Sequence, residues 1–338
     1  MMTTVAASPG EARPVRAGLA PRFEYLPVAL FGAVMGLTGL SVAWRLASAR
    51  YGLPTLVADA IGWGALLTFL VLALAYGAKA VTAWPTVLAE FRHPIAGNLF
   101  GTVLISLLLL PFVLGGVSPT LAVAAWVTGA AGMVVFAVLI VSRWMGSRQQ
   151  IAHATPAWMV PVVGLLDIPL AAPVLGLPHT QTLAMFALSV GLFFAVPLFT
   201  LVFARLVFEE PLPAGQRPTL MILVAPFAVG FSSYTATLGR IDAFAEALFL
   251  IGLFVLAVLV GRLRDLPRCC PFRVSWWAVS FPLAAMAGAA LRYAGQAGAP
   301  AIDALALGLL AFATVTIAAL AVRTLIGIAR GDLRRLTS

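Results

Sequence analysis

The stretch SWWAVSFPLAAMAGAALRY, from Ser275 to Tyr293, is apolar over the length of a membrane-crossing helix, yet it carries Phe281 and Pro282 side by side. About 20 apolar residues in a helix cross the ~30 Å hydrocarbon core of a bilayer. A proline frees a backbone carbonyl, which at membrane depth must be satisfied by neighbouring protein or by a water-filled cavity. The stretch therefore predicts a helix in the interior of a membrane protein.

The rest of the chain supports this class. Of 338 residues, 62% are hydrophobic and 10% are charged, which leaves too little polar surface for a soluble domain. The apolar blocks have helix length, and they lack the short alternating pattern of membrane β-barrels. We predict an all-α integral membrane protein with ten spans: 26–46, 56–83, 94–115, 120–144, 157–176, 182–208, 218–239, 243–263, 274–293 and 303–327.

The distribution of basic residues tests this count, because cytoplasmic loops are enriched in Lys and Arg. With ten spans, 17 of the 21 Lys and Arg residues fall on one side, together with both ends of the chain. The other side receives only Arg45, Arg50, Arg240 and Arg292. We therefore expect cytoplasmic tails at 1–24 and 330–338, and a transmembrane domain at 25–329. Because topology accounts for the net charge of +9, we expect no nucleic-acid partner.

Proline follows a second period along the chain. The odd-numbered spans contain Pro27, Pro111, Pro161, Pro169, Pro173, Pro226 and Pro282, whereas the even-numbered spans contain only Pro197. This pattern predicts five helical hairpins, with an inner ring of five kinked helices around a pore and an outer ring of five facing lipid. The alternative interpretation is that the prolines and glycines only ease tight packing.

A few polar residues are candidates for function. Asp167 is predicted within span 5, where an ionised carboxylate costs several kcal/mol, so it is either a proton or pore site, or else a protonated or backbone-bonded group. Arg45 and Arg292 lie at the outer ends of spans 1 and 9, where they either attract anions to a pore mouth or snorkel to the surface. Gly32, Gly36 and Gly39 form one small face of span 1, which favours close packing, with pore lining as the alternative. Enzyme motifs and metal-ligand clusters are lacking, so we expect no enzyme, cofactor or metal.

Several segments together resemble the tellurite-resistance/dicarboxylate transporter family, which includes bacterial tellurite-resistance protein A and the slow-type anion channels of plant guard cells. They are YLPVALFGAVMGLTGLSVAWR, EFRHPI, PAWMVPVVG, RPTLMILVAPFAVGFSSY and WWAVSFPLAAMA, in that order between Tyr25 and Arg330. The resemblance implies trimers of protomers that each have a central anion pore. It implies that Phe281 plugs this pore and that Gly32 makes room for its ring. Asp167 departs from the resemblance, because bacterial channel members are uncharged at that position.

The leading hypothesis is a gated channel for small monovalent anions such as chloride and nitrate, in a bacterial cytoplasmic membrane. The alternative is a proton-coupled transporter of C4-dicarboxylates, sulfite or tellurite-type oxyanions that uses Asp167. A structural or sensory membrane protein is disfavoured, because it would not explain why proline is confined to alternate spans.

Overall fold

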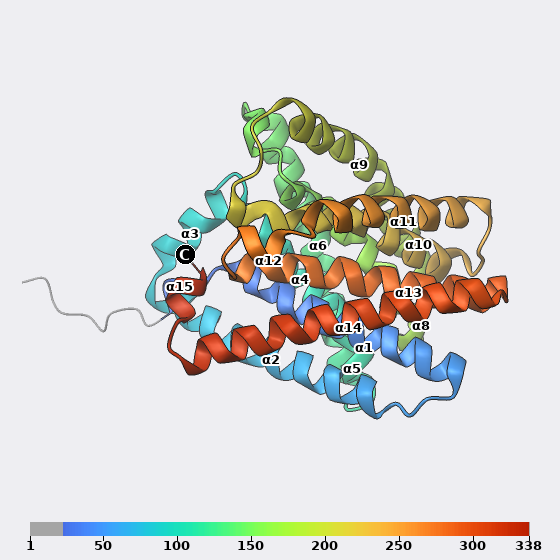
Figure 1. Cartoon of the computed structure of the whole chain (residues 1–338). Coiled ribbons are helices and arrows are strands. Elements are labelled where there is room, and N and C mark those ends of the chain that lie inside the picture. Colours follow the sequence, from blue (N-terminus) through green and yellow to red (C-terminus); the bar gives the residue numbers. More distant parts are fainter. Residues whose placement is uncertain (1–22, 338) are drawn as a thin grey trace, which may run out of the picture.

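The computed structural model describes residues 23–337, and within them every regular element is a helix (Figure 1). The predicted count of ten spans is confirmed. In chain order, spans 1–10 are Val28–Tyr51, Leu56–Thr82, Ala96–Leu114, Pro119–Gly146, Pro156–Leu175, Gln181–Phe208, Ala214–Leu238, Ala243–Cys269, Val274–Ala297 and Pro300–Ala329. The predicted tail at 1–24 lies, apart from Phe23 and Glu24, outside the described residues.

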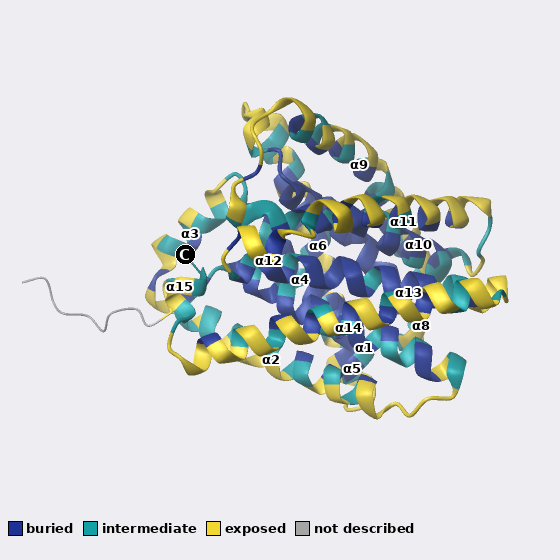
Figure 2. Cartoon of the chain, in the orientation of Figure 1, coloured by how far each residue is buried: buried dark blue, intermediate teal, exposed yellow. Residues whose placement is uncertain are grey.

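The even-numbered spans are long α-helices with much exposed surface. They are α2 (Leu56–Thr82), α6 (Pro119–Gly146), α9 (Gln181–Phe208), α11 (Ala243–Leu263) with the short α12 (Leu266–Cys269), and α14 (Pro300–Ala329). Between 17% and 39% of their most apolar windows is buried, and Figure 2 shows long exposed stretches on α2, α11 and α14. Apolar side chains on an exposed surface of this size require a lipid environment.

The odd-numbered spans are buried and interrupted. Between 61% and 83% of their windows is buried, and each span begins with a 3₁₀ segment before it continues as α-helix. The segments are η1 (Val28–Phe31) and α1 (Gly32–Tyr51); η2 (Ala96–Phe100), α4 (Gly101–Leu109) and α5 (Pro111–Leu114); η4 (Pro156–Met159), α7 (Val160–Val163), η5 (Gly164–Asp167) and α8 (Ile168–Leu175); η6 (Ala214–Val224) and α10 (Ala225–Leu238); η7 (Val274–Val279) and α13 (Ser280–Ala297).

Most of the predicted kink prolines lie where a new α-segment starts. Pro111, Pro161, Pro169 and Pro226 occupy the first two positions of α5, α7, α8 and α10, where the missing N–H costs no intrahelical hydrogen bond. Pro282 is the third residue of α13. Pro27 corrects the prediction, because it precedes Val28 in extended backbone and therefore begins span 1 without kinking it.

Hydroxyl groups from neighbouring odd spans bind carbonyls at the beginning of span 1. Thr102 Oγ1 and Ser106 Oγ lie 3.3 Å from the Val28 and Phe31 carbonyl oxygens, and Ser280 Oγ of span 9 lies 3.3 Å from the Gly32 carbonyl oxygen. The shorter bond of each hydroxyl, at 2.6 to 2.7 Å, goes to a carbonyl three or four residues earlier in its own span. The odd spans thus bring hydroxyl groups beside irregular backbone at membrane depth, where water cannot solvate it.

Contacts between the 3₁₀ segments follow one closed order: η1 with η2, η2 with η4, η4 with η6, η6 with η7, and η7 with η1. Each even span packs against at least one odd span: α2 on α1, α6 on α4, α9 and α11 on α10, and α14 on α13. We call the end of the molecule that holds α15 (Leu333–Thr337) and α3 (Trp84–Arg92) the terminal end, and the other the far end (Figure 1). Both short helices lie outside the predicted spans, and α15 falls within the predicted C-terminal tail.

Candidate functional site

Two cavities lie between the odd spans, and each is lined by residues from all five of them. The terminal-side cavity has a volume of about 110 Å³ and includes Gly32, Thr102, Asp167, Thr219 and Ser275 in its lining. The far-side cavity has a volume of about 50 Å³ and includes Gly39, Phe112, Leu170, Ser232 and Arg292. The 3₁₀ segments border only the first of them. Both cavities are therefore enclosed by the proline-bearing spans that the sequence singled out.

Phe281 lies between the two cavities. Its side chain lines both, it is 7% exposed, and the only other residue common to the two linings is Val229 of span 7. Phe281 is the second residue of α13, which begins at Ser280 directly after the 3₁₀ segment η7, and it precedes Pro282. The change from 3₁₀ to α geometry thus lies next to a residue that lines both cavities. No signal in the sequence marked Val229.

The glycine that lies against the Phe281 ring is Gly39. A Cβ built on Gly39 would be 3.3 Å from Cδ2 of the ring and 3.1 Å from Cβ of Ala284. Gly32 lines the terminal-side cavity together with Phe281, but the nearest atom to a Cβ there is the Trp277 carbonyl oxygen at 3.9 Å. The role of Gly32 as the space for the ring stays a prediction, and the direct contact belongs to the glycine two turns along the same helix.

Asp167 is 2% exposed and borders the terminal-side cavity at the end of η5. Within the described residues its Oδ1 is enclosed and has no hydrogen-bond partner, so the predicted alternative of a bond to freed backbone beside Pro161 and Pro169 is not formed. Asp167 is also the one ionisable side chain among the described residues that line this cavity. An ionised carboxylate would therefore be desolvated without a counter-ion, at a cost of several kcal/mol.

Ser275 is a second polar group of this cavity that the sequence argument did not single out. Its hydroxyl is enclosed and has no partner within residues 23–337. A hydroxyl is both donor and acceptor, and a buried one without a partner is uncommon in folded proteins. Ser275 and Asp167 therefore leave two unsatisfied polar groups on a cavity that is otherwise mostly apolar.

The structure separates the two arginines that the sequence grouped together. Arg45 forms an ion pair with Asp59 of α2, with 2.7 Å between Nη2 and Oδ1, so its charge is compensated. Arg292 lines the far-side cavity, and no hydrogen bond or ion pair to it occurs in the described part of the chain. Of the two, only Arg292 presents an uncompensated positive charge to a cavity between the odd spans.

Comparison with known proteins gives the family. The family described as voltage-dependent anion channel, SLAC1, matches residues 25–325. The chain belongs to this family. A plant member, the S-type anion channel SLAH2 of Arabidopsis thaliana, is 27% identical over 301 residues, which are 87% of this chain and 57% of the plant protein.

Two microbial relatives are covered more fully. An uncharacterized transporter of Methanocaldococcus jannaschii is 28% identical over 278 residues, 75% of this chain and 80% of the relative. The tellurite resistance protein TehA homolog of Haemophilus influenzae is 28% identical over 273 residues, 79% of this chain and 81% of the relative. The resemblance stated from the sequence is confirmed, and the SLAC1 family is one of channels and transporters. The chain spans about half the length of the plant channels, so their activities come to it only as proposals.

Proposed function

We propose that this protein is a gated anion channel, with a pore along the axis between the five odd spans that the Phe281 ring closes. One observation carries the proposal: two cavities, each lined by all five odd spans, meet at this side chain. The closed order of contacts among the 3₁₀ segments supports an inner ring of five, and the even spans packed outside it support an outer ring.

The lining favours anions of low hydration energy. The terminal-side cavity offers the unpartnered hydroxyl of Ser275 and no cationic side chain, whereas the hydroxyls of Thr102 and Thr219 already donate to backbone carbonyls. An anion there would exchange its water for a few hydroxyl and backbone donors. Weakly hydrated monovalent anions give up the least hydration free energy in this exchange. Chloride and nitrate are the expected ions, with modest discrimination between them, and Arg292 would raise their concentration at the far side.

The test is a conductance measurement on Phe281→Ala in planar bilayers. Wild type should conduct little, and Phe281→Ala should conduct chloride and nitrate at least tenfold better because the ring is removed from the constriction. Phe193→Ala is the matched control: Phe193 is 69% exposed on α9 and lines neither central cavity, so this variant should behave as wild type.

Truncation of a buried phenylalanine costs about 3–5 kcal/mol of stability, so the melting temperature of each variant must be measured too. Phe281→Leu keeps more apolar volume and should give an intermediate conductance. If folded Phe281→Ala conducts no better than wild type, the gate is assigned to the wrong residue.

Asp167 supports a second candidate, a proton-coupled transporter of C4-dicarboxylates, sulfite or tellurite-type oxyanions. The specific observation is its enclosed, unpartnered Oδ1 beside a cavity that contains no other ionisable side chain among the described residues. A proton carried by this carboxyl removes the cost of a buried charge, so binding and release of the proton would be linked to movement of the anion.

The two candidates differ in their response to Asp167→Asn. For a transporter, uptake of labelled malate or sulfite into proteoliposomes should follow an imposed pH gradient, and the variant should abolish this dependence. For a channel, flux should follow voltage and the anion gradient in both proteins. Thermal stability of the variant serves as the control for folding.

Three further assignments are proposals that follow from sequence. We propose that the terminal end faces the cytoplasm, because 17 of the 21 Lys and Arg residues fall on that side in the ten-span topology. The resemblance favours a homotrimer in a bacterial inner membrane. Protease accessibility of tags at each end would test the orientation, and the mass of the detergent-solubilised protein would test the trimer.

A further inference from the structure

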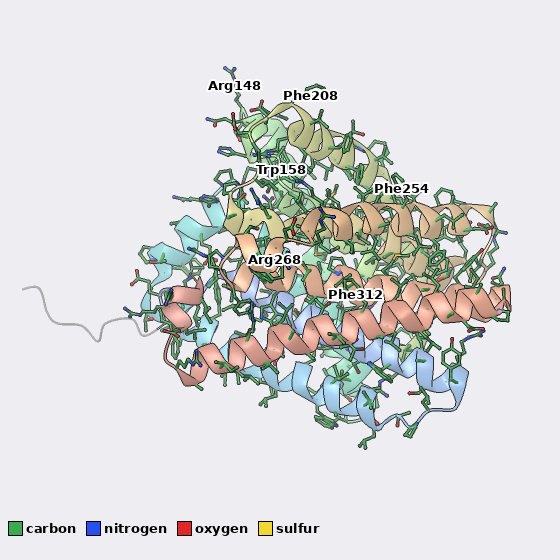
Figure 3. All side chains as sticks on the ribbon, viewed as in Figure 1. Arg148, Trp158, Phe208, Phe254, Arg268 and Phe312 are labelled. Atoms are coloured by element: carbon green, nitrogen blue, oxygen red, sulfur yellow. The ribbon has the colours of Figure 1, made fainter. Side chains whose placement is uncertain are left out.

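A large apolar groove lies on the outer surface of the molecule and shares no lining residue with the two central cavities. It occupies about 600 Å³ between α9, span 7 and α11, which are the outer helices of spans 6 and 8 and the buried span between them. Aromatic side chains form much of its wall, namely Phe199 and Phe203 of α9, Phe227 of α10 and Phe254 of α11. In Figure 3 Phe254 marks the α11 side of the groove.

The groove has the depth of one membrane leaflet. On α11 its lining runs from Ile251 to Leu263, which are twelve residues apart. At 1.5 Å per residue this distance is about 18 Å, a little more than half of the ~30 Å hydrocarbon core. A single acyl chain of one leaflet therefore matches the groove in length.

Two arginines lie at the terminal end of this groove. Arg217 of η6 and Arg262 of α11 both line it, and neither forms an ion pair with an acidic residue in the described part of the chain. Arg217 Nη1 lies 3.6 Å from the Cys269 sulfur, and this contact with a neutral thiol does not compensate the arginine charge. Glu209 and Glu210 precede the groove residue Pro211 but are joined to neither arginine, and Asp265 is paired with Arg264 and Arg268.

The groove is separated from the terminal-side cavity by η6 alone. Leu220 and Leu223 of η6 line the groove, whereas Thr219 and Ile222 of the same segment line the cavity. A molecule in the groove would thus contact the segment that also forms the wall of the central cavity.

We propose that this groove is a binding site for an anionic phospholipid, with one acyl chain along the aromatic wall and the phosphate at Arg217 and Arg262. An apolar trough of one-leaflet depth with two uncompensated cations at its interfacial end is complementary to such an amphiphile. A zwitterionic lipid has a positive charge in its headgroup, which would be repelled by the arginines and would lower the electrostatic binding energy. A helix from a second copy would fill the trough but would leave both arginine charges without a partner.

Native mass spectrometry of the detergent-solubilised protein tests the proposal with phosphatidylglycerol and phosphatidylcholine as probes. Wild type should retain phosphatidylglycerol in preference to phosphatidylcholine. The double variant Arg217→Gln/Arg262→Gln should bind phosphatidylglycerol about 30-fold more weakly, roughly fivefold for each arginine. Arg268→Gln is the matched control, because this exposed arginine at the same end lies outside the groove and interacts with Asp265 (Figure 3).

A second variant tests the acyl-chain part of the site. Ile251→Trp should fill the deep end of the groove and lower phosphatidylglycerol retention while both arginines remain, which separates a lipid from a bare phosphate ion. Ile251→Trp also keeps the proposal testable if the double arginine variant does not fold. Unchanged phosphatidylglycerol binding in both folded variants, or equal retention of the two lipids by wild type, would overturn the proposal.

The mass of the assembly is read in the same spectra. If the groove variants change the number of copies of the chain and leave lipid binding unchanged, a second copy occupies the groove and the proposal is wrong. Lipid binding is measured here without any conductance, so this result and the result for the proposed channel function are independent of one another.

Discussion

In this protein the buried odd spans are less apolar than the exposed even spans, which is the reverse of the pattern in soluble proteins. The buried odd spans have mean hydropathies of 1.4 to 2.1, whereas the exposed even spans have values of 2.0 to 2.7. In water the more apolar elements would be buried. Here the solvent is lipid, so continuous apolar helices suit the outside, and the inside can contain proline, hydroxyl groups and irregular backbone. Burial without high hydropathy is therefore the mark of the helices that enclose the cavities.

The contrast between polar buried spans and apolar exposed spans has an exception, because an even span also supplies a polar side chain to an odd one. Lys79 of α2 is 2% exposed, and its Nζ lies 2.6 Å from the Leu26 carbonyl oxygen and 2.7 Å from Oε2 of Glu90. Oε1 of Glu90 accepts a hydrogen bond of 2.7 Å from the Val28 amide. One buried ion pair thus binds the backbone on both sides of Pro27, where span 1 begins.

The largest expected effect is on stability, from loss of this pair. Lys79→Met should lower the free energy of unfolding by about 3–5 kcal/mol, because it leaves the Glu90 carboxylate buried without its cation. The matched control is Arg45→Met, whose pair with Asp59 has side chains 39% exposed and should contribute at most about 1 kcal/mol. Unfolding in mixed micelles measures both, and equal losses would show that the buried pair has no special role in holding span 1.

Close packing between odd spans gives the next effect. A Cβ on Gly36 would clash with Oγ and Cβ of Ser280, so Gly36→Ala should destabilise the protein by about 1–3 kcal/mol. Gly64 of α2 has no heavy atom within 4 Å of such a Cβ, and Gly64→Ala should be neutral or should stabilise by up to about 1 kcal/mol. The same micelle titration compares the two. A loss at Gly64 as large as at Gly36 would contradict the different packing of odd and even spans.

The burial of the odd spans could be predicted from the sequence because a proline frees a backbone carbonyl in the same span that contains it. Pro161, Pro169 and Pro226 each require satisfied backbone, whatever the neighbours are. The ten spans could also be predicted from the sequence, since length and hydropathy are local properties. The role of Lys79 could not be predicted, because Glu90 lies on α3, a helix that the apolar blocks did not reveal.

The finer features depend on how helices are rotated and paired. Gly32 and Gly39 belong to one small face, and only the rotation of α1 against α13 brings Gly39 to the Phe281 ring. The 3₁₀ segments at the beginnings of the odd spans contact one another, and the sequence argument did not predict them. Arg45 and Arg292 look alike in sequence, and they differ because Asp59 of α2 reaches only Arg45.

That difference gives the smallest effect, on flux. Arg292→Gln should reduce chloride conductance of the Phe281→Ala background about fivefold in low salt, the equivalent of about 1 kcal/mol, because a cation at the cavity raises local anion concentration. Arg45→Gln should change it less than twofold, since Asp59 already compensates that charge. The Arg292 effect should shrink as salt rises towards 1 M, where the Debye length falls to about 3 Å. Equal effects of the two substitutions at every salt concentration would show that anions do not pass the far-side cavity, and the conduction path would then have to be sought elsewhere than past Phe281.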